Sequence, residues 1–97
     1  GKELAKQQAT AAIQEGQTWL TDTQAMLAKA PRGKGSAADL AALKTDLEGA
    51  SASLNEAQTL LASENYKEAM AKAEAAKASI NGVKTQIEGA QAKVAGK

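Results

Sequence analysis

The sequence predicts an all-α fold, an up-down-up three-helix bundle with left-handed coiled-coil-like packing. Three observations support this prediction. Ala, the strongest helix former, supplies 24 of the 97 residues. Larger apolar side chains recur at alternating spacings of three and four, and two polar breaks divide the chain into segments of similar length. We therefore expect one domain over 1–97, with helices at about 2–30, 37–63 and 66–95 and a loop at 31–36.

The first predicted helix ends before Pro31, because the residue that precedes a proline is pushed out of the α region. One face of this helix repeats the spacing of three and four, and we call such a face a seam: Ile13, Gly16, Leu20, Thr23, Leu27 and Ala30. A second row lies beside it, formed by Ala12, Trp19 and Met26. Leu4 is off this register, so we expect the first turn to fray or the helical phase to shift there.

The second predicted helix has the clearest seam of the three: Leu40, Leu43, Leu47, Ala50, Leu54, Ala57 and Leu61. This pattern is typical of a helix that buries one narrow face against other helices. Ser36 is a suitable N-cap for this helix, and Asp39 can reach back to it in a capping-box arrangement.

The third predicted helix follows a short break. We expect Asn65 to be its N-cap, and Glu68 brings negative charge to its first turn, where the helix dipole favours it. Its seam continues to the end of the chain: Tyr66, Ala69, Ala73, Ala76, Ile80, Val83, Ile87, Ala90 and Val94. Asn81 and Gly82 form a hairpin signal, but the helical phase is the same on both sides of them. We therefore expect a continuous or slightly bent helix.

Four glycines fall inside the predicted helices, where each costs about 1 kcal/mol relative to alanine. Gly16 belongs to the seam, so close packing of helices explains it. Gly49, Gly82 and Gly89 fall outside the seam. One hypothesis is that Trp19 lies level with Gly49 and Gly82 and covers part of their bare backbone.

Composition argues against several classes of function. The chain has twelve basic and eleven acidic side chains, so its net charge of +1 does not favour electrostatic capture of nucleic acid. It has neither Cys nor His, which removes thiol nucleophiles, disulfides and histidine acid–base chemistry. We expect no enzyme, no cofactor and no metal site. No apolar run reaches the roughly 18–20 residues that cross a bilayer, so we expect no direct membrane insertion by this segment.

Two sets of residues are candidate sites. Trp19 and Met26, on the flank of the first seam, form either a patch that binds a partner or the cover over one edge of a thin core. Arg32 and Lys34, in the loop at 31–36, form either a solvated linker or a weak anion site at the start of the second helix. A phosphate-binding P-loop needs a different glycine spacing after a β-strand, and this loop has neither.

The break before the third helix carries a resemblance. Its sequence, LLASENYKEA over 60–69, resembles the turn of tetratricopeptide repeats, although no 34-residue period follows. From Pro31 to about Val83 the chain is similar to the uncharacterised Ala-rich helical domains of bacterial envelope lipoproteins, which are sometimes joined to OmpA-type peptidoglycan-binding domains. The similarity rests on a proline before Leu/Ala heptads, the tyrosine turn and the Ala-rich helix after it. The family's usual Gly-Asp before the tyrosine is Glu64 and Asn65 here, and the chain has no Cys to lipidate.

The resemblance implies a periplasmic or cell-surface location and a non-catalytic use. From it we expect a structural or protein-interaction module of the bacterial cell envelope. The alternative is a helix-binding or self-associating module that uses the Trp19 and Met26 flank, with another protein or a second copy of the chain as its partner.

Overall fold

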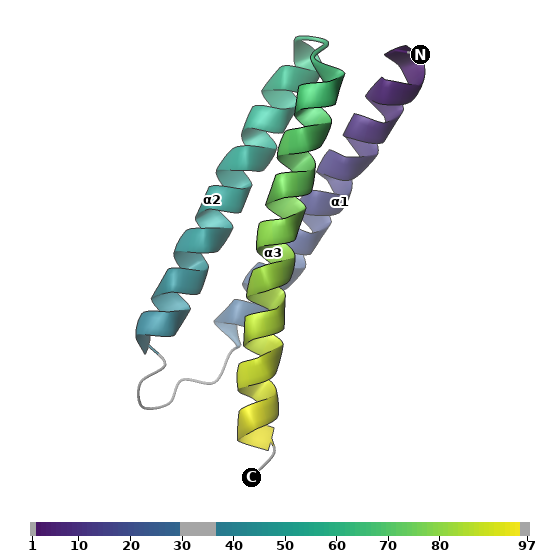
Figure 1. The fold of residues 1–97 in the computed structure, drawn as a ribbon. Helices are drawn as coiled ribbons and strands as arrows, with labels where there is room; N and C mark the ends of the chain where they lie inside the picture. The colour runs from purple at the N-terminus through teal and green to yellow at the C-terminus, as the bar shows by residue number, and fades with distance from the viewer. Residues whose placement is uncertain (1, 30–36, 96–97) are drawn as a thin grey trace.

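Three helices make up the fold, α1 (Lys2–Ala28), α2 (Ala37–Ala62) and α3 (Tyr66–Ala95). The computed structural model describes residues 2–29 and 37–95, with side chains described at 2–29 and 40–89. The helices run up, down and up along one another and form a rod of 53 × 20 × 15 Å (Figure 1). The described residues contain no strand, and the expected all-α three-helix bundle is confirmed.

The predicted helix bounds agree closely with the structure. The bounds of α3 are those predicted, and α2 ends one residue before its predicted end. The first helix ends at Ala28 rather than near residue 30, and the amide of Lys29 closes its last turn on the carbonyl oxygens of Ala25 (3.3 Å) and Met26 (3.1 Å). The expected roles of Pro31 and Ser36, and of the Asp39 side chain, lie outside the described residues.

Most of the buried core belongs to the predicted seams. From α2 it contains Leu43, Leu47, Ala50, Leu54 and Ala57, and from α3 Ala69, Ala73, Ala76, Ile80, Val83 and Ile87. From α1 it contains Ala9, Ala12, Ile13, Gly16 and Thr23. In α1, however, the buried Ala9 and Ala12 lie outside the seam, and the seam residues Leu20 and Leu27 are only partly buried. Large side chains pack against small ones on the facing helices, so the helices approach closely and the core is thin. Leu4 is 56% exposed, which agrees with its place off the register.

Gly16 shows how close this approach is. A Cβ atom at Gly16 would lie only 2.7 Å from Cδ2 of Leu54 and 3.4 Å from Cγ of Lys77. The leucine methyl group of α2 therefore occupies the space that a side chain on α1 would need. The close packing predicted for this glycine is confirmed.

A tight turn joins α2 to α3. The amide of Asn65 donates to the carbonyl oxygen of Leu60 (2.8 Å), and that of Glu64 donates to Leu61 (3.0 Å). These two bonds define a Schellman motif, in which the residue after the C-cap takes the left-handed conformation. Glu64 is that residue, with φ of 66°, although glycine is the usual choice there. The carbonyl of Asn65 then accepts the first bond of α3, from Ala69 (2.9 Å), which places Asn65 at the predicted N-cap position.

The third helix is continuous across Asn81 and Gly82, as expected from its phase. The hydroxyl of Thr85 donates to the carbonyl oxygen of Asn81 (2.9 Å), one turn earlier in the same helix. The hairpin signal at this dipeptide is therefore overridden by packing of the seam on both sides, at Ile80 and Val83.

Candidate functional site

Trp19 lies at the edge between α1 and α3. Its side chain is 37% exposed, and Nζ of Lys77 stands 5.0 Å from the centroid of its ring. This is the geometry of a cation–π contact, which contributes about 0.5–1 kcal/mol at an exposed site. One face of the indole is thus occupied by a neighbour from α3, and part of the ring remains open to solvent.

Lys77 is the centre of this edge. Its side chain is only 14% exposed, and its Nζ lies 2.5 Å from Oε1 of Glu15 on α1 and 3.6 Å from Oε1 of Glu74 on its own helix. The hydrogen bond to Glu15 raises the pKa of Lys77 above its usual 10.5, against the opposing effect of burial, and the charge of Glu74 adds to the increase. Lys77 therefore stays protonated and links α1 to α3.

Met26 lies about two turns after Trp19 in the same row of α1. It is half-buried and packs against the hydrophobic core. The row that Trp19 and Met26 share thus has two kinds of surface. Met26 covers the edge of the core, whereas Trp19 presents part of its ring outward.

The hypothesis that Trp19 covers Gly49 and Gly82 is wrong. A Cβ atom added at either glycine, or at Gly89, would have no neighbour within 4 Å. Gly49 and Gly82 line a shallow groove between α2 and α3, together with the small side chains of Ser53 and Ser79. Trp19 lies instead at the α1–α3 edge, beside Lys77.

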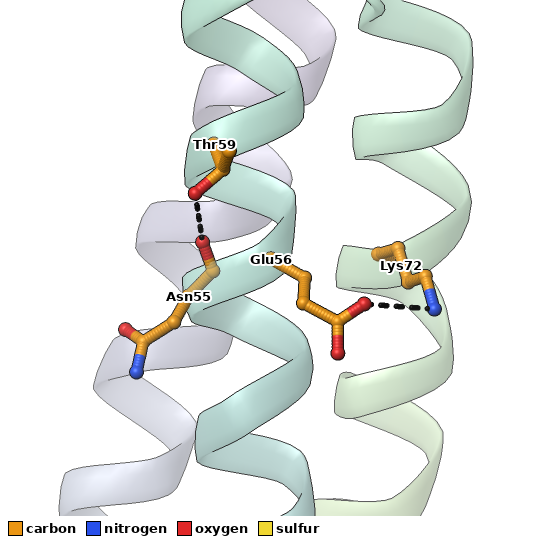
Figure 2. Close-up of polar contacts among 4 residues, drawn as sticks. All are labelled: Asn55, Glu56, Thr59 and Lys72. Atoms are coloured by element: carbon orange, nitrogen blue, oxygen red, sulfur yellow. Dashed lines mark hydrogen bonds and ion pairs between the residues drawn. The ribbon is translucent and has the colours of Figure 1, made fainter.

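An ion pair spans α2 and α3 beside this groove. Figure 2 shows the side chain of Glu56 extending from α2 toward Lys72 on α3, with 3.1 Å between Oε2 and Nζ. The two side chains are 59% and 48% exposed, so solvent screens their attraction. In the same view the Thr59 hydroxyl donates to the carbonyl oxygen of Asn55 (3.2 Å), within α2. The Glu56–Lys72 pair therefore contributes little to holding α2 against α3.

The other predictions about sites have separate outcomes. Arg32 and Lys34, the candidate anion site, lie outside the described residues. Over 2–29 and 37–95, no three His, Cys, Asp or Glu side chains gather where they could hold a metal ion. None of the helices in the same ranges combines the length and the apolar character needed to cross a membrane.

Sequence reasoning missed the role of Lys77. The helical pattern does not single out Lys77, because lysines in an Ala-rich helix are usually solvated. Two signals were available in the sequence. Lys77 directly follows the seam residue Ala76, and Glu74 lies three residues before it.

Comparison of the chain with protein-family models, with curated proteins and with solved structures gives no match. The class is therefore defined by the fold and the surface alone. The chain is an all-α three-helix bundle whose most developed polar cluster, in the described part, links α1 to α3 at Trp19 and Lys77.

Proposed function

We propose that the chain is a non-catalytic structural or protein-interaction module of the bacterial cell envelope. The observation that carries the structural role is the shape of the bundle. The rod is 53 Å long and at most 20 Å across. The helix α1 begins near one end of this rod, and α3 ends near the other (Figure 1). A rod of this kind keeps apart whatever is attached to its two ends.

The use of side chains supports the same role. Leu47, Leu54, Ile80, Val83 and Ile87 are among the largest fully buried side chains. They serve to hold the helices together, as the side chains of a spacer must.

The envelope location is supported by the resemblance over 31–83, above all at the turn. Glu64 stands where the lipoprotein domains usually have glycine, and its φ of 66° is the conformation that glycine adopts most readily. Asn65 stands where those domains usually have aspartate, and both residue types are good N-caps. The turn of this chain therefore suits the family's residues at both positions.

Solution size tests the structural role. Light scattering at micromolar concentration is expected to give the mass of a 9.9 kDa monomer. Small-angle X-ray scattering is expected to give an elongated particle whose radius of gyration is slightly above the 15.5 Å of its Cα atoms, because side chains and hydration add to it. A compact sphere or a flexible chain would contradict a rigid spacer.

Fractionation tests the location. In cells that make the protein from its own gene, an antibody against the bundle is expected to detect it in the periplasmic or envelope fraction, separated from a cytosolic marker. Recovery with the cytosolic marker would contradict the proposed location and leave the structural role to the scattering experiment.

A second candidate function is self-association or helix binding through Trp19 and Met26, and the 37% exposure of Trp19 favours it. If the chain self-associates, it is a dimer at micromolar concentration, and Trp19→Ala restores the monomer. Leu4→Ala is the matched control, because Leu4 is an exposed apolar residue of the same helix outside this flank. A wild-type monomer whose Trp19 is protected from acrylamide quenching would exclude the candidate.

A further inference from the structure

We propose that α1 is a displaceable helix. It detaches from the α2–α3 hairpin as one unit, and the hairpin stays folded. The first observation is how the core is divided among the helices. Among the described residues, α2 buries three leucines and α3 buries two isoleucines and a valine, whereas Ile13 is the one side chain of this size that α1 buries. The hydrophobic stabilisation, which grows with the apolar area removed from water, is therefore concentrated between α2 and α3.

The second observation is what holds α1 in place. Its larger apolar residues Leu20, Met26 and Leu27 are only partly buried. Its specific contacts with α3 include the ion pair of Glu15 with Lys77 and the contact of Lys77 with Trp19, at an edge where Glu15 is 52% exposed. Contacts of this kind add little to stability because water competes for them. The contact of α1 with α3 is nearly as extensive as that of α2 with α3, but α1 contributes smaller buried side chains to it, and α1 touches α2 less.

The third observation is that α2 and α3 have their own connection. The Schellman turn closes on Leu60 and Leu61 and starts α3 at Asn65, all within the hairpin. The Glu56–Lys72 pair likewise joins α2 to α3 without a residue from α1. Departure of α1 breaks none of these contacts, so local opening of α1 costs less than unfolding of the whole chain.

Opening of α1 uncovers a defined surface. Leu54, which lies against Gly16 in the closed bundle, becomes accessible together with its neighbours in the seam. The uncovered face fits an amphipathic helix with a small residue opposite Leu54, which is the chemistry of α1 itself. This inference does not depend on the proposed function, because it concerns the order in which the bundle opens.

Native-state hydrogen exchange of the whole chain, followed amide by amide, tests this proposal. In α1 the amide of Ile13 is expected to exchange at least about tenfold faster than those of Leu54 in α2 and Ile80 in α3, after correction for intrinsic rates. Equal protection in all three helices would overturn the proposal, and so would earlier opening of α2 or α3.

The variant Glu64→Gly makes the test sharper. It relieves the left-handed strain at the turn, which is formed both in the closed bundle and in the opened state. Amides of α2 and α3 should therefore exchange about fivefold more slowly, the factor that corresponds to about 1 kcal/mol, while amides of α1 keep their wild-type rates. If exchange in α1 slows by the same factor, α1 opens only when the whole chain unfolds and the proposal fails.

Two further variants serve as controls. Glu64→Ala removes the same carboxylate and keeps a side chain in the left-handed conformation, so it should leave all three helices close to their wild-type rates. Glu15→Gln weakens the contact of Glu15 with Lys77, which exists in the closed bundle and not in the opened state. The closed bundle alone is destabilised, so amides of all three helices should exchange faster by one common factor. Acceleration confined to α2 and α3 would contradict the proposed order of opening.

Discussion

The α2–α3 hairpin and the α1 helix are built from similar sequences and are held in different ways. The hairpin buries Leu47 and Leu54 against Ile80 and Ile87, and each of these side chains is at most 2% exposed. The first helix joins this core mainly through alanines, a glycine and a threonine, with one buried isoleucine. The comparison shows that a regular seam makes a helix fit its neighbours, while the size of the seam residues decides how firmly it is held.

The largest expected effect contrasts one leucine from each region. Leu54→Ala removes a side chain that is 1% exposed and is expected to reduce the free energy of unfolding by about 2–5 kcal/mol. Leu20→Ala makes the same change at a half-buried position of α1 and should cost about half as much. Urea unfolding followed by circular dichroism measures both. An equal or larger cost at Leu20 would remove the distinction between the two regions.

The next effect contrasts a glycine of the seam with one of the open groove. Gly16→Ala places a Cβ atom 2.7 Å from a methyl group of Leu54, and overpacking of about 1–3 kcal/mol outweighs the gain of about 1 kcal/mol in helix propensity. Gly49→Ala has open space around it and is expected to stabilise the chain by about 1 kcal/mol. The melting temperatures of the two variants should therefore move in opposite directions. A stabilising Gly16→Ala would show that α1 does not rest on Leu54.

A smaller effect concerns the polar hold on α1. The pKa of Lys77 in the folded state is raised above 10.5. The stability that the protonated Lys77 contributes is therefore present in full below pH 10.5 and is lost as the pH rises through the raised pKa. Lys77→Met should reduce the free energy of unfolding at pH 8 by less than about 1 kcal/mol, because Glu15 is half exposed. The loss should appear as a lower melting temperature. The difference from the wild type should shrink above pH 10.5. Lys84→Met, at an exposed lysine of the same helix, is the control and should show no such convergence.

The smallest effect is expected at the ion pair of the hairpin. Glu56→Gln removes the charge that faces Lys72 between two exposed side chains, so stability should change by no more than about 0.5 kcal/mol. Thermal unfolding at low and high salt measures it, and any difference should vanish at high salt. A loss of several kcal/mol would mean that charge, rather than the leucine seam, holds α2 to α3.

The core of this fold could be predicted from the sequence because burial follows the helical period. The spacing of Leu43, Leu47 and Leu54 identifies one face of α2, and Gly16 in the facing seam implies close approach. The bounds of α3 follow from a recognisable cap at Asn65 and an uninterrupted phase.

Features that depend on the angular position of a residue around its helix could not be predicted as well. The hypothesis about Trp19 and Gly49 failed because being level along the rod does not place two residues on the same edge. The left-handed conformation of Glu64 could not be predicted, because the residue at that position of a helix end is usually glycine. The bonding of Lys77 to Glu15 depends on the contact between two helices, which a single-helix pattern does not contain.

The central claim is that α1 docks on the α2–α3 hairpin with Gly16 packed against Leu54. Nuclear Overhauser spectroscopy of the chain with labelled leucine methyl groups tests it most directly. The account predicts cross-peaks from the Leu54 methyl protons to the Gly16 Hα protons, accompanied by cross-peaks from the Trp19 indole to the Lys77 side chain. Leu54 methyl groups that show contacts with α3 and none with Gly16 would contradict it.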